Sequence, residues 1–182
     1  EFSQIIRERM SITEDILPVM ERISELTKES IFLTWKENKE GVTLAIAESE
    51  ERIKFSVSIG TRTPLYVGAS CKVIMAYLSK DEQINVMEDG FQRFTVNTTN
   101  DMESLLKELN EIKKQGWSYT CGEYTDQVFG LGVPLFDKND RVVASVTIAG
   151  PQYRLNDKKK KEMLHILLEE TKEIQQMIYN LA

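Results

Sequence analysis

Residues 128–149 read VFGLGVPLFDKNDRVVASVTIA, which is two apolar segments around a short polar link. Residues 128–136 and 142–149 are rich in β-branched and aromatic side chains, which favours β-strands. The link between them, Asp137–Asp140, consists of residue types that are common in turns. So short a link joins antiparallel strands, because a parallel pair needs a crossover of a dozen residues or more. We therefore predict an antiparallel hairpin here.

Four more strands are predicted upstream of this hairpin. The first two, Ile31–Trp35 and Val42–Ala47, flank a polar turn over Lys36–Gly41. Ile53–Ile59 alternates strictly between apolar and polar residues, which is the pattern of a half-buried strand. The fourth is Trp117–Cys121. Together with the hairpin these segments predict one antiparallel sheet of about six strands.

A long helix is predicted from Ser3 to about Thr27. Thr13, followed by two acidic residues, resembles an N-cap within this stretch. Pro18 is compatible with a helix that starts near Thr13, because proline is tolerated in the first turn. The expected buried stripe is Ile16, Leu17, Met20, Ile23 and Leu26.

Further helices are predicted between and after the strands, over Cys71–Leu78, Glu82–Met87, Asp101–Gly116 and Asp157–Leu181. Helices and strands do not alternate one for one, as they would around a parallel sheet. The fold class that we predict is therefore α+β, a single antiparallel sheet flanked by helices.

Composition limits the function. The chain has 182 residues, with 23 Lys and Arg against 29 Asp and Glu, for a net charge of −6. An acidic chain is a poor binder of nucleic acid by itself, because phosphates are neutralised by clustered cations. No apolar run is long enough to span a bilayer, and no secretion signal is visible, so we expect a cytoplasmic protein with no membrane partner.

The reactive side chains are few. His165 is the only histidine, and no HExxH or Cys/His cluster occurs, so we expect neither a metal site nor a histidine-based catalytic triad. Cys71 and Cys121 are not arranged as CxxC. Either thiol as a nucleophile would make the chain an enzyme, but without a partner histidine we favour buried cysteines that act as small apolar residues. We therefore expect no catalytic residues and no cofactor.

Two stretches are candidates for a ligand pocket. Gly68-Ala69-Ser70 precedes an apolar helix, whose free N–H groups would favour a carboxylate or a phosphate. The alternative is a tight turn with Ser70 as N-cap. Tyr119–Glu123 carries hydroxyl, thiol and carboxylate groups on or just after a strand, where alternate side chains could line a pocket or face outward.

Four segments in a consistent order resemble motifs of the IclR-type transcriptional regulators. They are PLYVGASCKVIMA (64–76), LKELNEIKKQGW (106–117), Glu123 with Val128 and PLFD (134–137), and AGPQYR (149–154). The resemblance implies a GAF-like, effector-binding domain over residues 29–182, with residues 1–28 as a connecting helical segment. It also implies a small organic metabolite as ligand, with carboxylic acids among the candidates.

The same resemblance implies that DNA is bound only through an N-terminal winged helix-turn-helix domain, which is absent from this chain, and that the protein forms a homodimer or homotetramer. Ile5, Ile6 and Met10 would then pack on a neighbouring copy. The effector, the target promoter and the sign of regulation stay open. Two other interpretations also stay open, a GAF-type sensor attached to a signalling protein and a cysteine-dependent enzyme.

Pocket residues follow from the resemblance by position. The effector-binding residues it implies are Gly68, Ala69, Ser70, Thr120, Cys121, Gly130, Thr147 and Ala149. This chain departs from the family pattern at Tyr66, Cys71, Gln127 and Ala149, where the family usually has His, Gly, Gly and Ser. The added bulk at Cys71 and the lost hydroxyl at Ala149 predict a smaller or differently shaped pocket.

Overall fold

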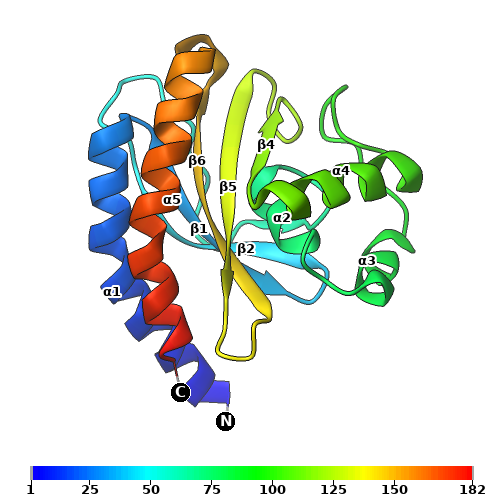
Figure 1. Cartoon of the computed structure of the whole chain (residues 1–182), viewed down its shortest axis with the longest axis horizontal. Helices are drawn as coiled ribbons and strands as arrows, with labels where there is room; N and C mark the ends of the chain where they lie inside the picture. Colours follow the sequence, from blue (N-terminus) through cyan, green and yellow to red (C-terminus); the bar gives the residue numbers. More distant parts are fainter. Residues whose placement is uncertain (1, 182) are drawn as a thin grey trace.

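A computed structural model describes residues 2–181 of the chain, and it confirms the α+β class. Its six-stranded antiparallel sheet has the order β3-β2-β1-β6-β5-β4 (Figure 1). The strands are β1 (Ser30–Glu37), β2 (Glu40–Ala47), β3 (Arg62–Pro64), β4 (Ser118–Cys121), β5 (Val128–Phe136) and β6 (Val142–Pro151).

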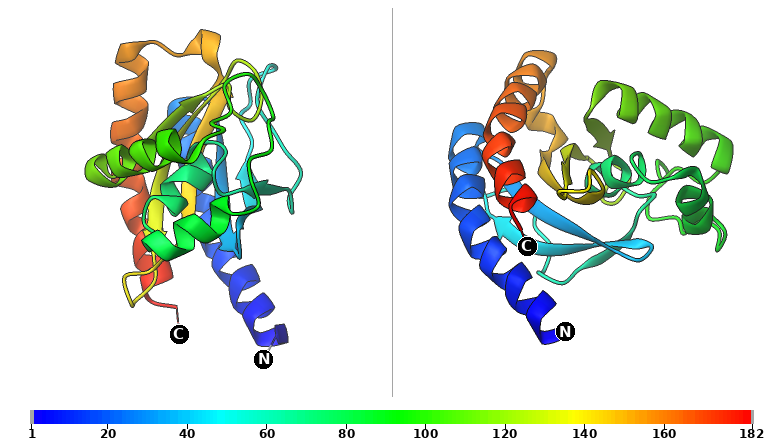
Figure 2. Two further views of the ribbon diagram at one scale, coloured as in Figure 1. Left: turned by 90° about the vertical axis from the view of Figure 1, so that its right-hand side faces the viewer. Right: turned by 60° about the horizontal axis from the view of Figure 1, so that its bottom comes forward.

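Helices cover both faces of the sheet. They are α1 (Phe2–Thr27), α2 (Ala69–Met75), α3 (Lys80–Met87), α4 (Met102–Gln115) and α5 (Asp157–Tyr179), with a short 3₁₀ turn at Gln152–Arg154. Helices α1 and α5 lie side by side on one face, and α2, α3 and α4 lie on the other (Figures 1 and 2). None of the described helices is long and apolar enough to cross a membrane.

The predicted hairpin is confirmed, and its alternation assigns each side chain to a face. Val146 and Ile148 of β6 are fully buried in the core beneath α1 and α5. Ser145, Thr147 and Ala149 alternate with them and therefore face the α2 side. Two different environments, a dry core and a polar-lined layer, thus lie on the two sides of one strand.

Helix α1 differs from the prediction in three details. It is one continuous helix, so Thr13 is not an N-cap; its hydroxyl donates to the Arg9 carbonyl oxygen inside the helix. Pro18 lies in the middle of the helix rather than in its first turn. Leu26 is 53% exposed and leaves the predicted stripe, whereas Ile16 and Ile23 are fully buried.

The boundary predicted at residue 28 stays a prediction. The apolar side chains of α1 lie in the same core as those of the sheet. Met10 is exposed, and the side chains of Ile5 and Ile6 lie outside the described residues.

The predicted strand over Ile53–Ile59 is wrong. These residues form no ladder, because the edge of β2 is occupied by the segment that follows them: Gly60 N donates to Thr43 O, and Thr43 N donates to Thr61 O. The sixth strand is instead Arg62–Pro64. The alternating pattern gave a wrong prediction because this segment, like a half-buried strand, is buried on one side only, with Phe55 and Val57 turned toward a cavity.

Candidate functional site

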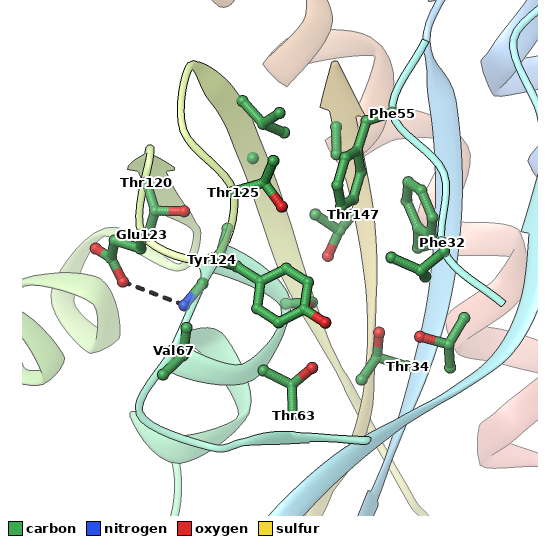
Figure 3. A pocket seen from close by; sticks show the side chains of 18 of the residues that line it. Phe32, Thr34, Phe55, Thr63, Val67, Thr120, Glu123, Tyr124, Thr125 and Thr147 are labelled. Atoms are coloured by element: carbon green, nitrogen blue, oxygen red, sulfur yellow. Dashed lines mark hydrogen bonds between the residues drawn. The ribbon is translucent and has the colours of Figure 1, made fainter. Parts of the chain in front are cut away.

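A cavity of about 90 Å³ lies between the N-terminal end of α2, the polar face of the sheet and the segment around Phe55 (Figure 3). Its walls combine aromatic and aliphatic side chains with many hydroxyl groups. The lining residues are Phe32, Thr34, Thr43, Phe55, Val57, Thr61, Thr63, Val67, Gly68, Ala69, Ser70, Thr120, Glu123, Tyr124, Thr125, Val128, Phe129, Gly130, Thr147 and Ala149. A concave site in which polar groups converge among apolar side chains is typical of small-molecule binding.

Helix α2 begins at the cavity wall. Gly68 takes the N-cap position with φ 83°, a conformation that glycine adopts without strain, and no side chain caps the helix. The prediction that Ser70 is the N-cap is therefore wrong. Ser70 lies one residue inside the helix and contributes to the lining.

Small residues and two serines hold α2 close to the sheet. A Cβ on Gly130 would lie 3.0 Å from the Ala69 Cβ, so only glycine leaves this approach unhindered. The Ser118 hydroxyl donates to Ala69 O at 2.7 Å, and the Ser145 hydroxyl donates to Ser70 O at 2.8 Å. The cavity is thus bounded by a helix end that is fixed by packing and by hydrogen bonds.

The sheet contributes an aromatic ring and a hydroxyl group from two neighbouring residues on adjacent strands. Phe32 of β1 pairs in register with Thr147 of β6, and both face the cavity. The Phe32 ring centroid lies 5.6 Å from that of Phe55, and Tyr124 extends into the space opposite them (Figure 3). Thr147 is 4% exposed, and its Oγ1 has no hydrogen-bond partner within the described part of the chain.

Glu123 is the charged residue of the lining. Its Oε1 accepts a hydrogen bond from Gly68 N at 3.1 Å, and its Oε2 accepts one from Lys72 Nζ at 2.8 Å. Lys72 is completely buried in α2 and also donates to Thr99 and to Glu108 of α4. Burial raises the pKa of Glu123 above its ordinary value, and the Lys72 charge opposes that rise. The two donors on its oxygens, one of them the Lys72 ammonium, favour the ionised form of the carboxylate.

The turn that carries Glu123 is held by the loop before α4. The Thr98 hydroxyl donates to Glu123 O at 2.8 Å and accepts from the backbone N–H groups of Phe94 and Thr95. Thr95 also donates to Gly122 O. Glu123 is therefore positioned from both its backbone and its carboxylate.

All but one of the effector-binding residues implied by the resemblance lie in the wall of this cavity. Those that line the cavity are Gly68, Ala69, Ser70, Thr120, Gly130, Thr147 and Ala149. Cys121 is not in the lining, because side chains alternate along β4 and Thr120 takes the inward position. Binding of an effector to the other positions stays a prediction.

Sequence reasoning missed the opposite wall. Phe32 and Thr34 lie on the inward face of β1, where the alternation of a strand could have indicated them. Phe55 was assigned to a strand that does not form. Tyr124 belongs to a turn whose side-chain directions no periodicity predicts, whereas Glu123, in the same turn, is part of the predicted candidate stretch Tyr119–Glu123.

The departures from the family pattern have other consequences than predicted. Cys71 is not in the lining; it is buried beside Gly41, where a Cβ would lie 2.7 Å from the Cys71 Sγ. Its bulk therefore does not shape the cavity. The Tyr66 hydroxyl accepts from Gln92 N at 2.6 Å, outside the cavity. Gln127 has φ 61°, a conformation that suits the glycine of the family.

The cysteines are poor nucleophiles. Burial raises the pKa of the Cys71 thiol to about 12, so the thiolate is scarce at neutral pH. Burial also raises the pKa of Cys121. Within the described part of the chain, no group of three or more His, Cys, Asp or Glu side chains is placed to hold a metal ion.

Comparison with known proteins identifies relatives of this domain. The family described as "Bacterial transcriptional regulator IclR C-terminal" matches residues 5–176. The regulator KipR of Bacillus subtilis is 26% identical over 158 residues, which cover 86% of this chain and 63% of KipR. The chain thus spans less than two thirds of the length of this relative.

Solved structures share the fold. The IclR of Thermotoga maritima matches with a TM-score of 0.85 at 26% identity, over 98% of this chain and 74% of that one. The inducer-binding domain of the Acinetobacter transcription factor PobR, a double mutant in complex with 3-hydroxybenzoic acid, matches with a TM-score of 0.81 at 18% identity. This match covers 90% of our chain and 97% of PobR's.

Proposed function

Because this chain belongs to the IclR family of bacterial transcriptional regulators, we propose that its cavity binds a small organic metabolite and that this binding controls attachment of the full-length protein to DNA. The observation that carries the proposal is the convergence of family-matched positions on one cavity. Ala69, Gly130 and Thr147 come from three separate elements and meet at its wall.

The DNA contact belongs to a part of the regulator outside this chain. With a net charge of −6, the domain itself is poorly suited to bind phosphates. The proposed role is therefore regulatory rather than catalytic, in a cytoplasmic protein that assembles as a homodimer or homotetramer.

Ligand binding can act on DNA binding only through a difference in affinity between two conformations. The cavity is suited to this coupling because its walls come both from the sheet and from the segments that cover the sheet's polar face, including the start of α2. Glu123 joins the cavity wall to α2 through Gly68 N, and Lys72 joins the same carboxylate to α4. A ligand that moves Glu123 would thus change the contacts of two helices, α2 directly and α4 through Lys72.

The proposal is tested by thermal-shift screening, because a ligand that binds the native state raises its melting temperature. The panel holds small carboxylic, sugar and aromatic acids together with their uncharged analogues. PobR in its complex with 3-hydroxybenzoic acid shows that this fold accommodates a small aromatic compound in a relative.

The site is tested with Ser70→Trp, which would fill the cavity beside α2. This variant should remain folded but lose the ligand-induced rise in melting temperature. Ser104→Trp, on the exposed side of α4, is the matched control and should respond as the wild type does. A ligand that stabilises the Ser70→Trp variant as much as the wild type would place the binding site elsewhere.

A further inference from the structure

The hydroxyl of Thr147 is the first indication of what the cavity binds. A buried hydroxyl without a partner is costly, so nearly all such groups in proteins are hydrogen-bonded. Thr147 lies in the cavity wall (Figure 3), and its buried Oγ1 has no hydrogen-bond partner among the described residues. A ligand with a polar atom at this point would supply the missing hydrogen bond.

Charge is the second indication. Among the described residues, Glu123 is the only ionisable carboxyl or ammonium side chain in the lining, and it is a carboxyl group paired with the Lys72 ammonium. Lys72 offers no positive charge to a ligand, because its side chain is fully buried and its ammonium donates to Glu108, Glu123 and Thr99. A carboxylate in this cavity would meet no free cation and would lie in the same enclosure as Glu123.

The backbone donor at the start of α2 is also engaged. Gly68 N donates to Glu123 Oε1 at 3.1 Å, so the protein's own carboxylate already occupies the place where this N–H would receive an anion. Moving a second carboxylate out of water without a counter-charge is far more costly than moving a neutral amide or alcohol.

Size and shape are the third indication. The cavity of about 90 Å³ is smaller than the engineered 150 Å³ cavity that holds benzene, so it encloses only a small group. The rings of Phe32, Phe55 and Tyr124 border this space and suit a flat or apolar moiety. A larger ligand would keep part of itself at the open side.

We propose that the effector is a small uncharged molecule, an amide, alcohol or carbonyl compound that hydrogen-bonds Thr147 and places its apolar part among the aromatic rings. This inference rests on the proposed function, since it assumes that the effector occupies this cavity. It departs from the expectation of a carboxylic acid, for which the described residues provide a competing anion and no free cation.

The test compares acids with amides of the same shape. Propanoate and propanamide, and benzoate and benzamide, differ in charge but hardly in size, and further pairs extend the series. Their dissociation constants for the chain are measured by calorimetry at pH 7.5. We expect the amide of a binding pair to bind at least tenfold more tightly than the acid.

Two variants connect this preference to named groups. Thr147→Val keeps the shape but removes the hydroxyl, and should weaken amide binding at least fivefold. Thr27→Val is the matched control, because the Thr27 hydroxyl is buried away from the cavity, and amide binding should be unchanged. Glu123→Gln removes the competing charge and should reduce the amide preference at least threefold.

The outcomes separate the two proposals. Acids that bind as tightly as their amides, with binding abolished by Ser70→Trp, would overturn the uncharged effector and leave the proposed sensor function in place. An amide preference that Thr147→Val and Glu123→Gln both leave unaltered would also overturn it. If no member of any pair binds at millimolar concentration, both the effector class and the sensing role of this cavity fail.

Discussion

Lys72 Nζ lies 2.8 Å from Glu123 Oε2, which joins a lysine with no exposed side-chain surface to a carboxylate on the cavity wall. Glu108, whose side chain is 41% exposed, completes the cluster from α4. The single ammonium group of α2 thereby pairs with two carboxylates, one from α4 and one from the turn after β4.

Replacing Lys72 by methionine should destabilise the domain. The change keeps the length of the side chain but leaves Glu123 without its buried counter-charge, and loss of one partner of a buried ion pair costs about 3 kcal/mol. Urea unfolding followed by circular dichroism measures the free energy of unfolding. Lys39→Met is the control, because Lys39 pairs with Glu88 and Asp89 on the surface, and it should leave the midpoint unchanged.

The cost of Lys72→Met should also depend on pH. Lys72 lowers the pKa of Glu123 against the effect of burial, so the variant raises that pKa further above the ordinary value of 4.5. A carboxyl with a raised pKa binds its proton more tightly in the folded state, so stability falls as pH rises through the interval above 4.5. The difference between wild type and variant should therefore grow from pH 4.5 to pH 7.5. A difference that shrinks over this interval would contradict the assignment.

Thr147→Val should not destabilise the unliganded domain. The wild-type hydroxyl is buried without a partner, so its removal loses no hydrogen bond and relieves a desolvation cost of about 1 kcal/mol. The melting temperature of the variant should equal or exceed that of the wild type. Thr27→Val should instead lower it, because the Thr27 hydroxyl donates to Ile23 O at 2.8 Å. Equal losses in both variants would show that Thr147 has a partner in solution.

The segment 53–57 should exchange its amide hydrogens rapidly. It crosses the open side of the cavity outside the sheet, whereas β1 is paired on both edges. Amides outside a hydrogen-bonded ladder exchange with little protection. Hydrogen exchange with mass spectrometry should show these peptides labelled within seconds while residues 31–35 stay protected. Equal protection of the two segments would instead support the predicted strand over Ile53–Ile59.

Cys71 should resist alkylation in the native protein. With a pKa of about 12 and no access to solvent, it should react with iodoacetamide roughly a thousandfold more slowly than a free cysteine at pH 7.5. Peptide mapping distinguishes it from Cys121, and unfolding in urea should make the two equally reactive. Rapid labelling of native Cys71 would revive the cysteine-dependent enzyme that the structure disfavours.

Local sequence patterns are sufficient to predict the fold class and most of the helices and strands. The hairpin of β5 and β6, the cap at Asp101 and the left-handed Gly116 that ends α4 are local features, set by turn chemistry and periodicity. Motif resemblance likewise located one wall of the cavity, because Gly68–Ser70 and Gly130 lie where α2 meets the sheet.

The residues of the other wall, and the charges that meet there, depend on how distant parts of the chain pack together. Ile53–Ile59 could join the sheet only at the edge of β2, but Arg62–Pro64 pairs with that edge instead. An alternating pattern does not show which of two segments will pair with a given strand. The partners Lys72 and Glu123 lie 51 positions apart in the sequence, and the paired residues Phe32 and Thr147 lie 115 positions apart. Such meetings follow from packing over the whole chain, since no local preference encodes which distant side chains will share a cavity.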